Sequence, residues 1–185
     1  MRARRLTMTF LGSAALAIAM AAGTVGTAAA DNDKTAMRAV AAGVVGTVAA
    51  DNDKSAVMAA NAGFYAALNR MFVGESAPME SVWSHADDVT YMGPTGGYDR
   101  GWSAILKNWQ EQAAMHLGGK VEPTDIQFIA GHDLAVVSEY EVGENTNAKG
   151  VVAKLKLRAT NIFRKENGQW KMIGHHTDTL PYLAK

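Results

Sequence analysis

The strongest constraint on the fold lies near the C-terminal end, where two strand-like segments flank an Asn-Gly pair. Residues 155–178 read LKLRATNIFRKENGQWKMIGHHTD, and the turn falls at Glu166, Asn167 and Gly168. Asn and Gly tolerate the positive φ angles of a tight two-residue turn, and the flanking segments contain many apolar and β-branched residues. The pattern predicts a β-hairpin, which supplies two adjacent antiparallel strands of a sheet.

Strict alternation along these strands divides their side chains between two faces. On the first strand, Asn161 shares a face with Leu157 and Phe163, while Arg158 lies on the other face. On the second strand, alternation places five residues on one face: Trp170, Met172, Gly174, His176 and Asp178. Polar groups therefore follow an apolar stretch on each strand. A sheet that lines a pocket and a sheet whose ends reach solvent both explain this pattern.

Length and composition allow one domain and exclude several classes of function. The chain has 185 residues, 48% of them hydrophobic, which is enough for one domain with a core. Its 18 basic and 18 acidic residues balance, so a nucleic-acid partner has no electrostatic support. The sequence has no cysteine, which excludes disulfides, thiolate catalysis and cysteine-ligated metals. It contains no Gly-rich phosphate loop and no serine nucleophile motif, and we expect no cofactor.

The N-terminal segment has the features of a secretory signal peptide. Three arginines precede an apolar stretch at 6–22, and the three alanines at 28–30 come directly before Asp31. The alternative is an uncleaved membrane anchor, but the stretch is rich in Ala, Gly and Thr and short for a bilayer span. We predict a signal peptide at 1–30, export to the periplasm or the medium, and no stable membrane insertion after cleavage.

Residues 21–40 and 41–60 repeat each other without a gap, so the end of the signal segment and the start of the domain are duplicated. The second copy carries another cleavage-like site, three small residues directly before Asp51. A single pair of copies is too few for a repeat architecture. We therefore predict a flexible spacer, or at most a helical extension, at 31–50 and one domain at 51–185, with both sites open to processing.

The order of the remaining elements predicts the fold class. Helical spacing of apolar residues predicts three helices, at 51–73, 76–83 and 102–117. Before the hairpin, strands are expected at 88–93, 120–130 and 132–143, with a loop at 94–101. Helices early and strands late predict an α+β fold, with N-terminal helices packed on a strongly curved, largely antiparallel sheet. Such a sheet forms a cone with an internal pocket.

Three segments carry a resemblance to a known family: FYAALNRMF (64–72), MESVWSHADDVTYMGPTGGYDRGW (79–102) and RATNIFRKENGQWKMIGHHTD (158–178). Through them the chain resembles the SnoaL-like branch of the nuclear transport factor 2-like (NTF2-like) superfamily, which also holds ketosteroid isomerases. The resemblance implies a cone-shaped pocket and, frequently, a homodimer packed through the sheet. It does not transfer a reaction, because members include isomerases, hydrolases, cyclases and proteins without known activity.

The richest cluster of reactive side chains is His-His-Thr-Asp at 175–178. His176 and Asp178 lie two residues apart, so a strand projects them to one face, where a carboxylate raises the basicity of an imidazole. This pair is the candidate catalytic base, and the alternative is a histidine that only caps the sheet. The histidines and nearby acids lack the spacing of a metal site, and we expect no metal.

Five further residues are candidates for ligand contact: Tyr91, Asn161, His85, Trp109 and Tyr140. Asn161 can donate to a substrate carbonyl, and His85 is expected at the pocket rim unless its Asp-rich segment is only a turn. The aromatic residues line the pocket or fill the core. These features predict an exported protein that binds a small apolar or aromatic molecule and catalyses acid–base isomerisation or hydrolysis. The alternative is a non-catalytic module for ligand binding or dimerisation.

Overall fold

The computed structural model describes residues 53–146 and 149–179. The described residues belong to one compact unit. The predicted signal peptide at 1–30 and spacer at 31–50 lie outside the described residues.

The described residues contain the three predicted helices. The N-terminal helix runs through residues 53–71, α2 is Pro78–Val82 and α3 is Trp102–Ala114. The N-terminal helix is amphipathic, and its apolar side chains Val57, Phe64 and Met71 are fully buried. No helix in this part of the chain is long and apolar enough to cross a membrane.

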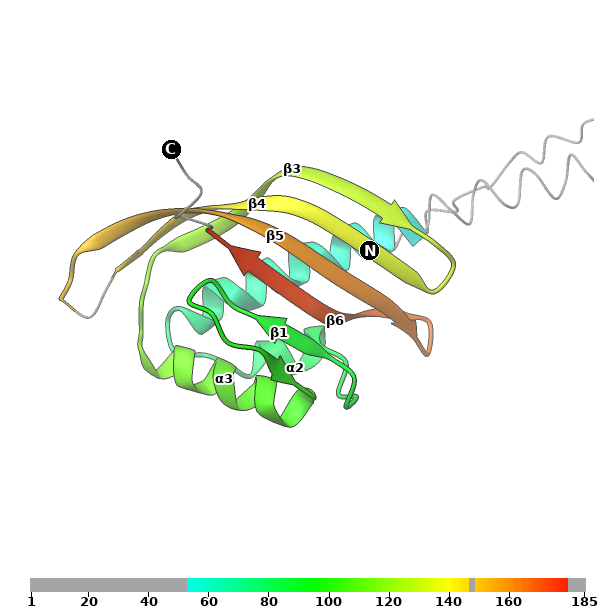
Figure 1. Cartoon of the computed structure of the whole chain (residues 1–185), viewed down its shortest axis with the longest axis horizontal. Coiled ribbons are helices and arrows are strands. Elements are labelled where there is room, and N and C mark those ends of the chain that lie inside the picture. The colour runs from blue at the N-terminus through cyan, green and yellow to red at the C-terminus, as the bar shows by residue number, and fades with distance from the viewer. Residues whose placement is uncertain (1–52, 147–148, 180–185) are drawn as a thin grey trace, which may run out of the picture. The chain divides into compact units, whose positions relative to one another are not determined.

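Six strands form one sheet in the described residues. They are β1 (Thr90–Met92), β2 (Asp99–Arg100), β3 (Lys120–Ala130), β4 (Leu134–Thr146), β5 (Val152–Glu166) and β6 (Gln169–Asp178). Their spatial order is β2-β1-β6-β5-β4-β3, and only β1 and β6 pair in parallel. Figure 1 shows the long strands curving over the helices without closing into a barrel. The predicted α+β fold with a curved, largely antiparallel sheet is confirmed.

One element falls where the sequence predicts a loop. The two-residue strand β2 lies inside 94–101 and pairs with β1 through Thr90–Arg100 and Tyr91–Asp99. Two residues are too few to show alternation, so no periodicity reveals this strand. Its pairing holds the segment beside α3, which begins directly after it.

The closing hairpin forms as predicted, but its register shifts. Asn167 and Gly168, with φ angles of 50° and 80°, make the two-residue turn between β5 and β6. Phe163 pairs with Met172, whereas the preceding Ile162 pairs with Gly174, so β6 contains one extra residue, Ile173. This β-bulge reverses which side chains face inward along the rest of the strand.

The bulge changes which histidine faces the interior. Trp170 and Met172 are buried before the bulge, whereas His175 and Thr177 are buried after it. His176 is exposed. The prediction that Trp170, Met172 and His176 share a face is therefore wrong, because strict alternation does not account for an inserted residue.

Large apolar side chains fill the space between the sheet and the helices. Phe64, Trp83, Trp109 and Phe163 are almost completely buried, and burying a large apolar side chain contributes roughly 1.5–3 kcal/mol. Polar residues interrupt this core at a few positions. The buried ones that concern the site below are Asn61, Glu139, Glu141, Asn161, His175 and Thr177.

Candidate functional site

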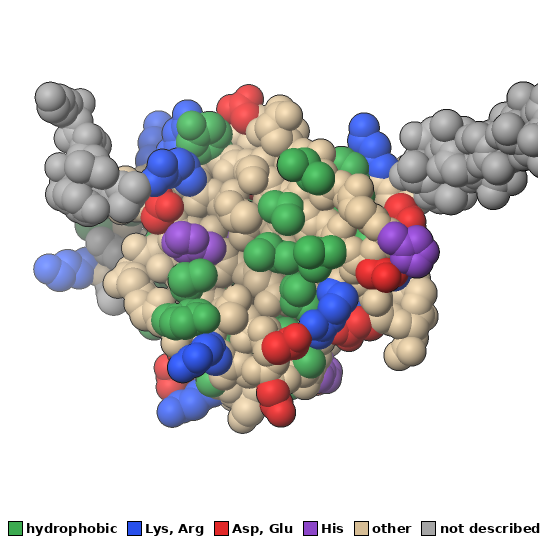
Figure 2. Space-filling view, turned by 45° about the vertical axis from the view of Figure 1, so that its right-hand side comes forward, with side chains coloured by type: hydrophobic (Ala, Val, Ile, Leu, Met, Phe, Trp, Pro, Cys, Tyr) green, Lys and Arg blue, Asp and Glu red, His purple; other side chains and the backbone are tan. Residues whose placement is uncertain are grey.

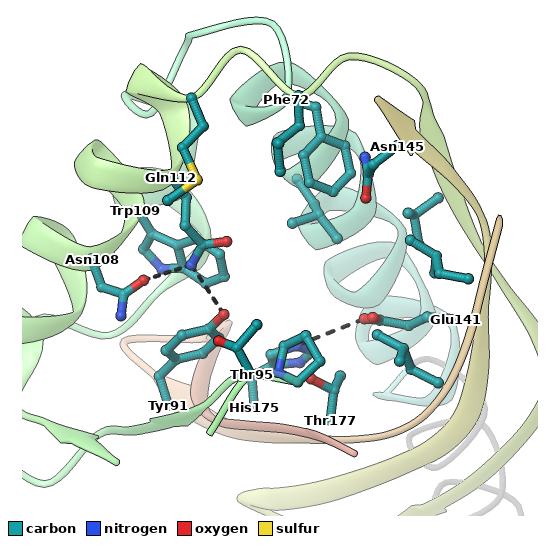
Figure 3. A pocket seen from close by; sticks show the side chains of 18 of the residues that line it. Phe72, Tyr91, Thr95, Asn108, Trp109, Gln112, Glu141, Asn145, His175 and Thr177 are labelled. Atoms are coloured by element: carbon teal, nitrogen blue, oxygen red, sulfur yellow. Dashed lines mark hydrogen bonds and ion pairs between the residues drawn. The ribbon is translucent and has the colours of Figure 1, made fainter. Parts of the chain in front are cut away.

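A cavity of about 300 Å³ lies between the N-terminal helix, α3 and the inner face of the sheet. Its wall is mainly apolar, with Leu68, Phe72, Trp109 and Leu157 among the lining side chains. Figure 3 shows the polar side chains that project toward the same space. They are Tyr91, Thr95, Asn108, Gln112, Glu141, Asn145, His175 and Thr177. Among the described residues, no lysine or arginine belongs to this wall.

His175 is held in one tautomer by the amide of Asn161. Its Nδ1 lies 2.5 Å from Asn161 Oδ1, and a carbonyl oxygen only accepts, so Nδ1 carries the proton and Nε2 has a free lone pair. The orientation of the amide is fixed because its Nδ2 donates to Asn61 Oδ1 at 2.8 Å and to Glu139 Oε1 at 2.9 Å. Burial, with a smaller contribution from His176, lowers the pKa of His175 to about 3. The imidazole is therefore neutral near pH 7.

Glu141 is the titratable carboxyl on the cavity wall. Its side chain is buried, and its Oε1 lies 3.1 Å from the Tyr65 hydroxyl and 3.7 Å from His175 Nε2. Burial raises the pKa of Glu141 to about 7; the Tyr65 hydrogen bond opposes the shift, and the charge of Glu139 adds to it. At neutral pH the group is therefore divided between acid and base, as a proton-transfer residue requires.

A second set of polar groups surrounds Tyr91 on the α3 side of the cavity (Figure 3). Gln112 Nε2 donates to the Tyr91 hydroxyl at 3.1 Å and to Asn108 Oδ1 at 2.5 Å. Burial raises the pKa of Tyr91 to about 12, so the phenol keeps its proton at neutral pH. Because its oxygen already accepts from Gln112, its O–H is free to donate into the cavity.

Two buried polar atoms at this site lack a partner. Trp109 Nε1 and Thr177 Oγ1 have no hydrogen-bond partner among the described residues, and both side chains line the cavity. Buried polar groups are nearly always satisfied, and exceptions often mark functional positions. Neither atom has appreciable accessible surface, so both groups are unsatisfied within the wall itself.

The structure brings only part of the predicted site together. Tyr91 and Trp109 line the cavity. Asn161 lies behind His175 and uses its amide within the protein, where it orients the imidazole. His176 is exposed outside the cavity, and Asp178 forms an ion pair with Arg158, with Oδ1 2.6 Å from Nη2.

The remaining two candidates also lie outside the cavity. His85 is exposed and stacks on Trp102 at 4.5 Å between ring centroids. Tyr140 points to the face of β4 opposite Glu141, and Lys156 Nζ lies 4.4 Å from the centre of its ring. No group of three or more His, Asp or Glu in the described part of the chain is placed to hold a metal ion.

Sequence reasoning missed the most important carboxyl of the site, although a signal was present. Along β4 the buried face continues from Ala135 and Val137 to Glu139 and Glu141. Two carboxylates that extend an apolar alternation are therefore directed inward. Tyr65 likewise falls within the buried stripe of the N-terminal helix.

Comparison with known families places the chain in the SnoaL-like family. The model of the SnoaL-like domain matches residues 57–180, which is more than half of the chain. No curated protein matches the sequence significantly. The family assignment made from the three sequence segments is therefore confirmed.

Solved structures show the same fold. One is a Streptomyces avermitilis protein of the NTF2-like family, named as a candidate dehydratase. It is 24% identical with a TM-score of 0.62, and the match covers 70% of this chain and 97% of that protein. An NTF2-like superfamily protein from Salmonella enterica has 13% identity and a TM-score of 0.62, and the match covers 69% of this chain and 91% of that protein. A candidate ketosteroid isomerase from Shewanella frigidimarina has 18% identity and a TM-score of 0.53, and the match covers 64% of this chain and 90% of that protein.

Proposed function

We propose that the protein binds a small, uncharged and largely apolar molecule in this cavity and catalyses a proton transfer on it, as in an isomerisation or an elimination. The proposal rests on the environment of Glu141. This carboxyl is buried on a mainly apolar wall, and burial raises its pKa to about 7. A group that is half protonated at neutral pH can both take and return a proton.

The size and charge of the cavity support a small neutral substrate. Its volume of about 300 Å³ is at the lower end of the roughly 300–1,000 Å³ common for small-molecule sites, which suits a molecule of one or two rings. Because the described part of the wall has no lysine or arginine, a negatively charged substrate would lack a counter-charge there and would lose its hydration. The aromatic surfaces of Tyr91 and Trp109 favour a flat, apolar ligand.

The geometry supports a proton abstraction next to a carbonyl. Ionised Glu141 would take a proton from the carbon beside the carbonyl, breaking the C–H bond and forming an O–H bond on the carboxyl. The carbonyl oxygen would gain negative charge and accept a hydrogen bond from Tyr91, a donor placed before the reaction begins. Neutral His175 would accept a hydrogen bond from the bound molecule through Nε2. Glu141 would then return its proton to the product.

The test uses enolisable one- and two-ring ketones as probes, screened for binding by ligand-observed NMR and then incubated with the protein in D₂O. We expect deuterium to enter the carbon beside the carbonyl of a bound probe, and this exchange to disappear in Glu141→Gln. The matched control is Glu144→Gln, an exposed position on the same strand. Exchange that survives in Glu141→Gln contradicts the proposed role.

A non-catalytic ligand carrier is the alternative, and the mainly apolar cavity wall favours it. The same experiment separates the two functions. Binding of several probes without deuterium exchange in any of them would identify a carrier.

We also propose that the protein acts after export and as a homodimer. Export is supported by the basic and apolar N-terminal segment. The dimer is supported by exposed apolar side chains on the sheet, among them Ile129, Leu134 and Val142. Figure 2 shows apolar side chains gathered on one face with charged groups around them. Mass spectrometry of the exported protein and light scattering of the purified protein test these two proposals.

A further inference from the structure

Two buried carboxyls share one tyrosine hydroxyl beside the cavity. Glu139 and Glu141 point to the same face of β4 and are 6% and 4% exposed. The Tyr65 hydroxyl lies 2.7 Å from Glu139 Oε1 and 3.1 Å from Glu141 Oε1. A hydroxyl has one proton and cannot donate it fully to both carboxyls. One of the two contacts is therefore satisfied best when the carboxyl itself supplies the proton.

The surroundings identify which carboxyl is ionised. Besides Tyr65, Glu139 accepts hydrogen bonds from two amides: Asn61 Nδ2 lies 2.9 Å from its Oε2, and Asn161 Nδ2 lies 2.9 Å from its Oε1. Several donors around a carboxyl stabilise its charged form. Glu141 has no such amide donor among the described residues. The arrangement is therefore complete when Glu141 carries a proton and donates it to Tyr65, which donates to ionised Glu139.

We propose that Glu139 and Glu141 share one proton through Tyr65, so that Glu139 is a proton store that lets Glu141 change between acid and base without exchange with solvent. In the step, the proton of Glu141 moves to the Tyr65 oxygen while the original Tyr65 proton moves to Glu139. One O–H bond breaks and one forms at Tyr65, which stays neutral, and the negative charge passes from Glu139 to Glu141. The use of this step in catalysis rests on the proposed function, whereas the shared proton does not.

The other groups that face Glu141 do not compete for this proton. His175 on β6 has a pKa lowered to about 3 by burial, and its Nδ1–H is held by Asn161. Tyr91 on β1 has a pKa raised to about 12 by burial. Tyr65 on the N-terminal helix has a pKa raised well above its usual value by burial and by both carboxylates, so it relays the proton without ionising.

Glu139 can exchange a proton with Glu141 because both groups are buried carboxyls. Burial raises its pKa, and the hydrogen bonds from Tyr65 and Asn61 oppose that shift. Two carboxyls so close cannot both ionise at low cost, and such a pair titrates as a unit in two steps. The first proton is lost from the pair, and the remaining one is shared until the pH rises past the second step.

The test is a pH titration of the glutamate side-chain carboxyl resonances by ¹³C NMR, on the intact protein without ligand. In the unmodified protein, the resonances of Glu139 and Glu141 should both respond to each of two steps. In Glu139→Gln, the Glu141 pKa should fall by roughly one unit or more, because a neighbouring negative charge is gone. In Tyr65→Phe, the two carboxyls should lose their common steps.

Matched controls remove the same groups elsewhere. Tyr140→Phe and Glu144→Gln lie on the same strand outside the cavity and should leave both resonances unchanged. An unchanged Glu141 pKa in Glu139→Gln, or independent single steps in the unmodified protein, would overturn the proposal. If Tyr65→Phe does not fold, Glu139→Gln decides the question. Because no ligand is needed, coupled titration without deuterium exchange on any probe would reject the proposed function alone.

Discussion

Two carboxylate clusters in this molecule are built from similar residues and have opposite electrostatics. Near the start of β1, Asp88 and Glu166 both bind Arg164, with Asp88 Oδ2 2.6 Å from Nη1 and Glu166 Oε1 2.8 Å from Nη2. The hydrogen bond from Arg164 is the main reason that the pKa of Asp88 lies below its usual value. At the cavity, Glu139 and Glu141 are buried with no cationic partner among the described residues, and burial raises both pKa values.

A nearby positive charge is what separates the two clusters, because the described residues place an arginine in the first and no lysine or arginine on the wall beside the second. An arginine fixes the charge of its partners across the neutral range, which makes them poor proton carriers. In the pair Glu139 and Glu141, the donors Asn61, Tyr65 and Asn161 bind the carboxyl oxygens of Glu139 and carry no full charge. Their hydrogen bonds oppose the effect of burial but do not cancel it, so the pKa of Glu139 stays raised. Residue type alone therefore does not predict which acidic cluster is suited to proton transfer.

The largest expected effect comes from the same substitution in the two clusters. Glu141→Gln should reduce deuterium exchange on a bound ketone by roughly 10²–10⁴-fold, the usual contribution of a positioned acid–base group. Glu166→Gln, in the arginine-paired cluster, should change it by less than about twofold. NMR exchange rates measure both. Equal losses in the two variants would show that the clusters do not differ in function.

Adding a cation to the inner cluster should make it resemble the outer one. Leu157 pairs directly with Glu141 across β4 and β5, and both line the cavity. In Leu157→Lys, the new ammonium should lower the Glu141 pKa by roughly 1–3 units and shift the exchange profile toward acid. Leu157→Met is the control for packing. A Glu141 pKa that stays near 7 in the lysine variant would contradict the role assigned to the missing cation.

The raised pKa of Glu141 should also appear in the pH dependence of stability. The folded state holds this proton more tightly than the unfolded state. The free-energy penalty for burying the ionised form of Glu141 is therefore absent below its unfolded pKa of 4.5 and largest above about 7. From pH 5 to pH 8, Glu141→Gln should therefore gain up to about 3 kcal/mol in free energy of unfolding relative to the unmodified protein. Urea denaturation at both pH values measures this difference, and a constant difference would count against a buried, raised carboxyl.

The smallest effect is expected from the exposed histidine. His176→Gln should change deuterium exchange by less than about twofold, because the side chain lies outside the cavity. His175→Gln should reduce exchange by about tenfold or more, because it removes the imidazole held by Asn161. The two variants, measured side by side, test the inward direction set by the bulge at Ile173. A larger loss in His176→Gln would reverse the assignment.

The fold could be read from the sequence because its signals are local. Asn167-Gly168 identifies the hairpin turn, and helical spacing identifies the N-terminal helix and α3. The strand β2 could not be found, because two residues show no period. The family resemblance then predicted how these elements pack together, and the structure confirms the predicted α+β fold.

The site was less predictable because only part of it follows from alternation. The inserted Ile173 turns His175 inward and His176 outward, and no residue type marks this bulge. The inward direction of Glu139 and Glu141 follows from strict alternation with Ala135 and Val137. Their joint contact with Tyr65 spans more than 70 residues of sequence and needs the folded chain.

The proposed function requires that Glu141 transfer protons in the cavity, and the pH profile of deuterium exchange on a bound ketone measures this step. Exchange needs the ionised carboxyl, so its rate should rise with pH, pass its midpoint near 7 and level off above it. The profile should vanish in Glu141→Gln. A profile with no midpoint near neutrality, or one that the substitution leaves unchanged, would contradict proton transfer by Glu141.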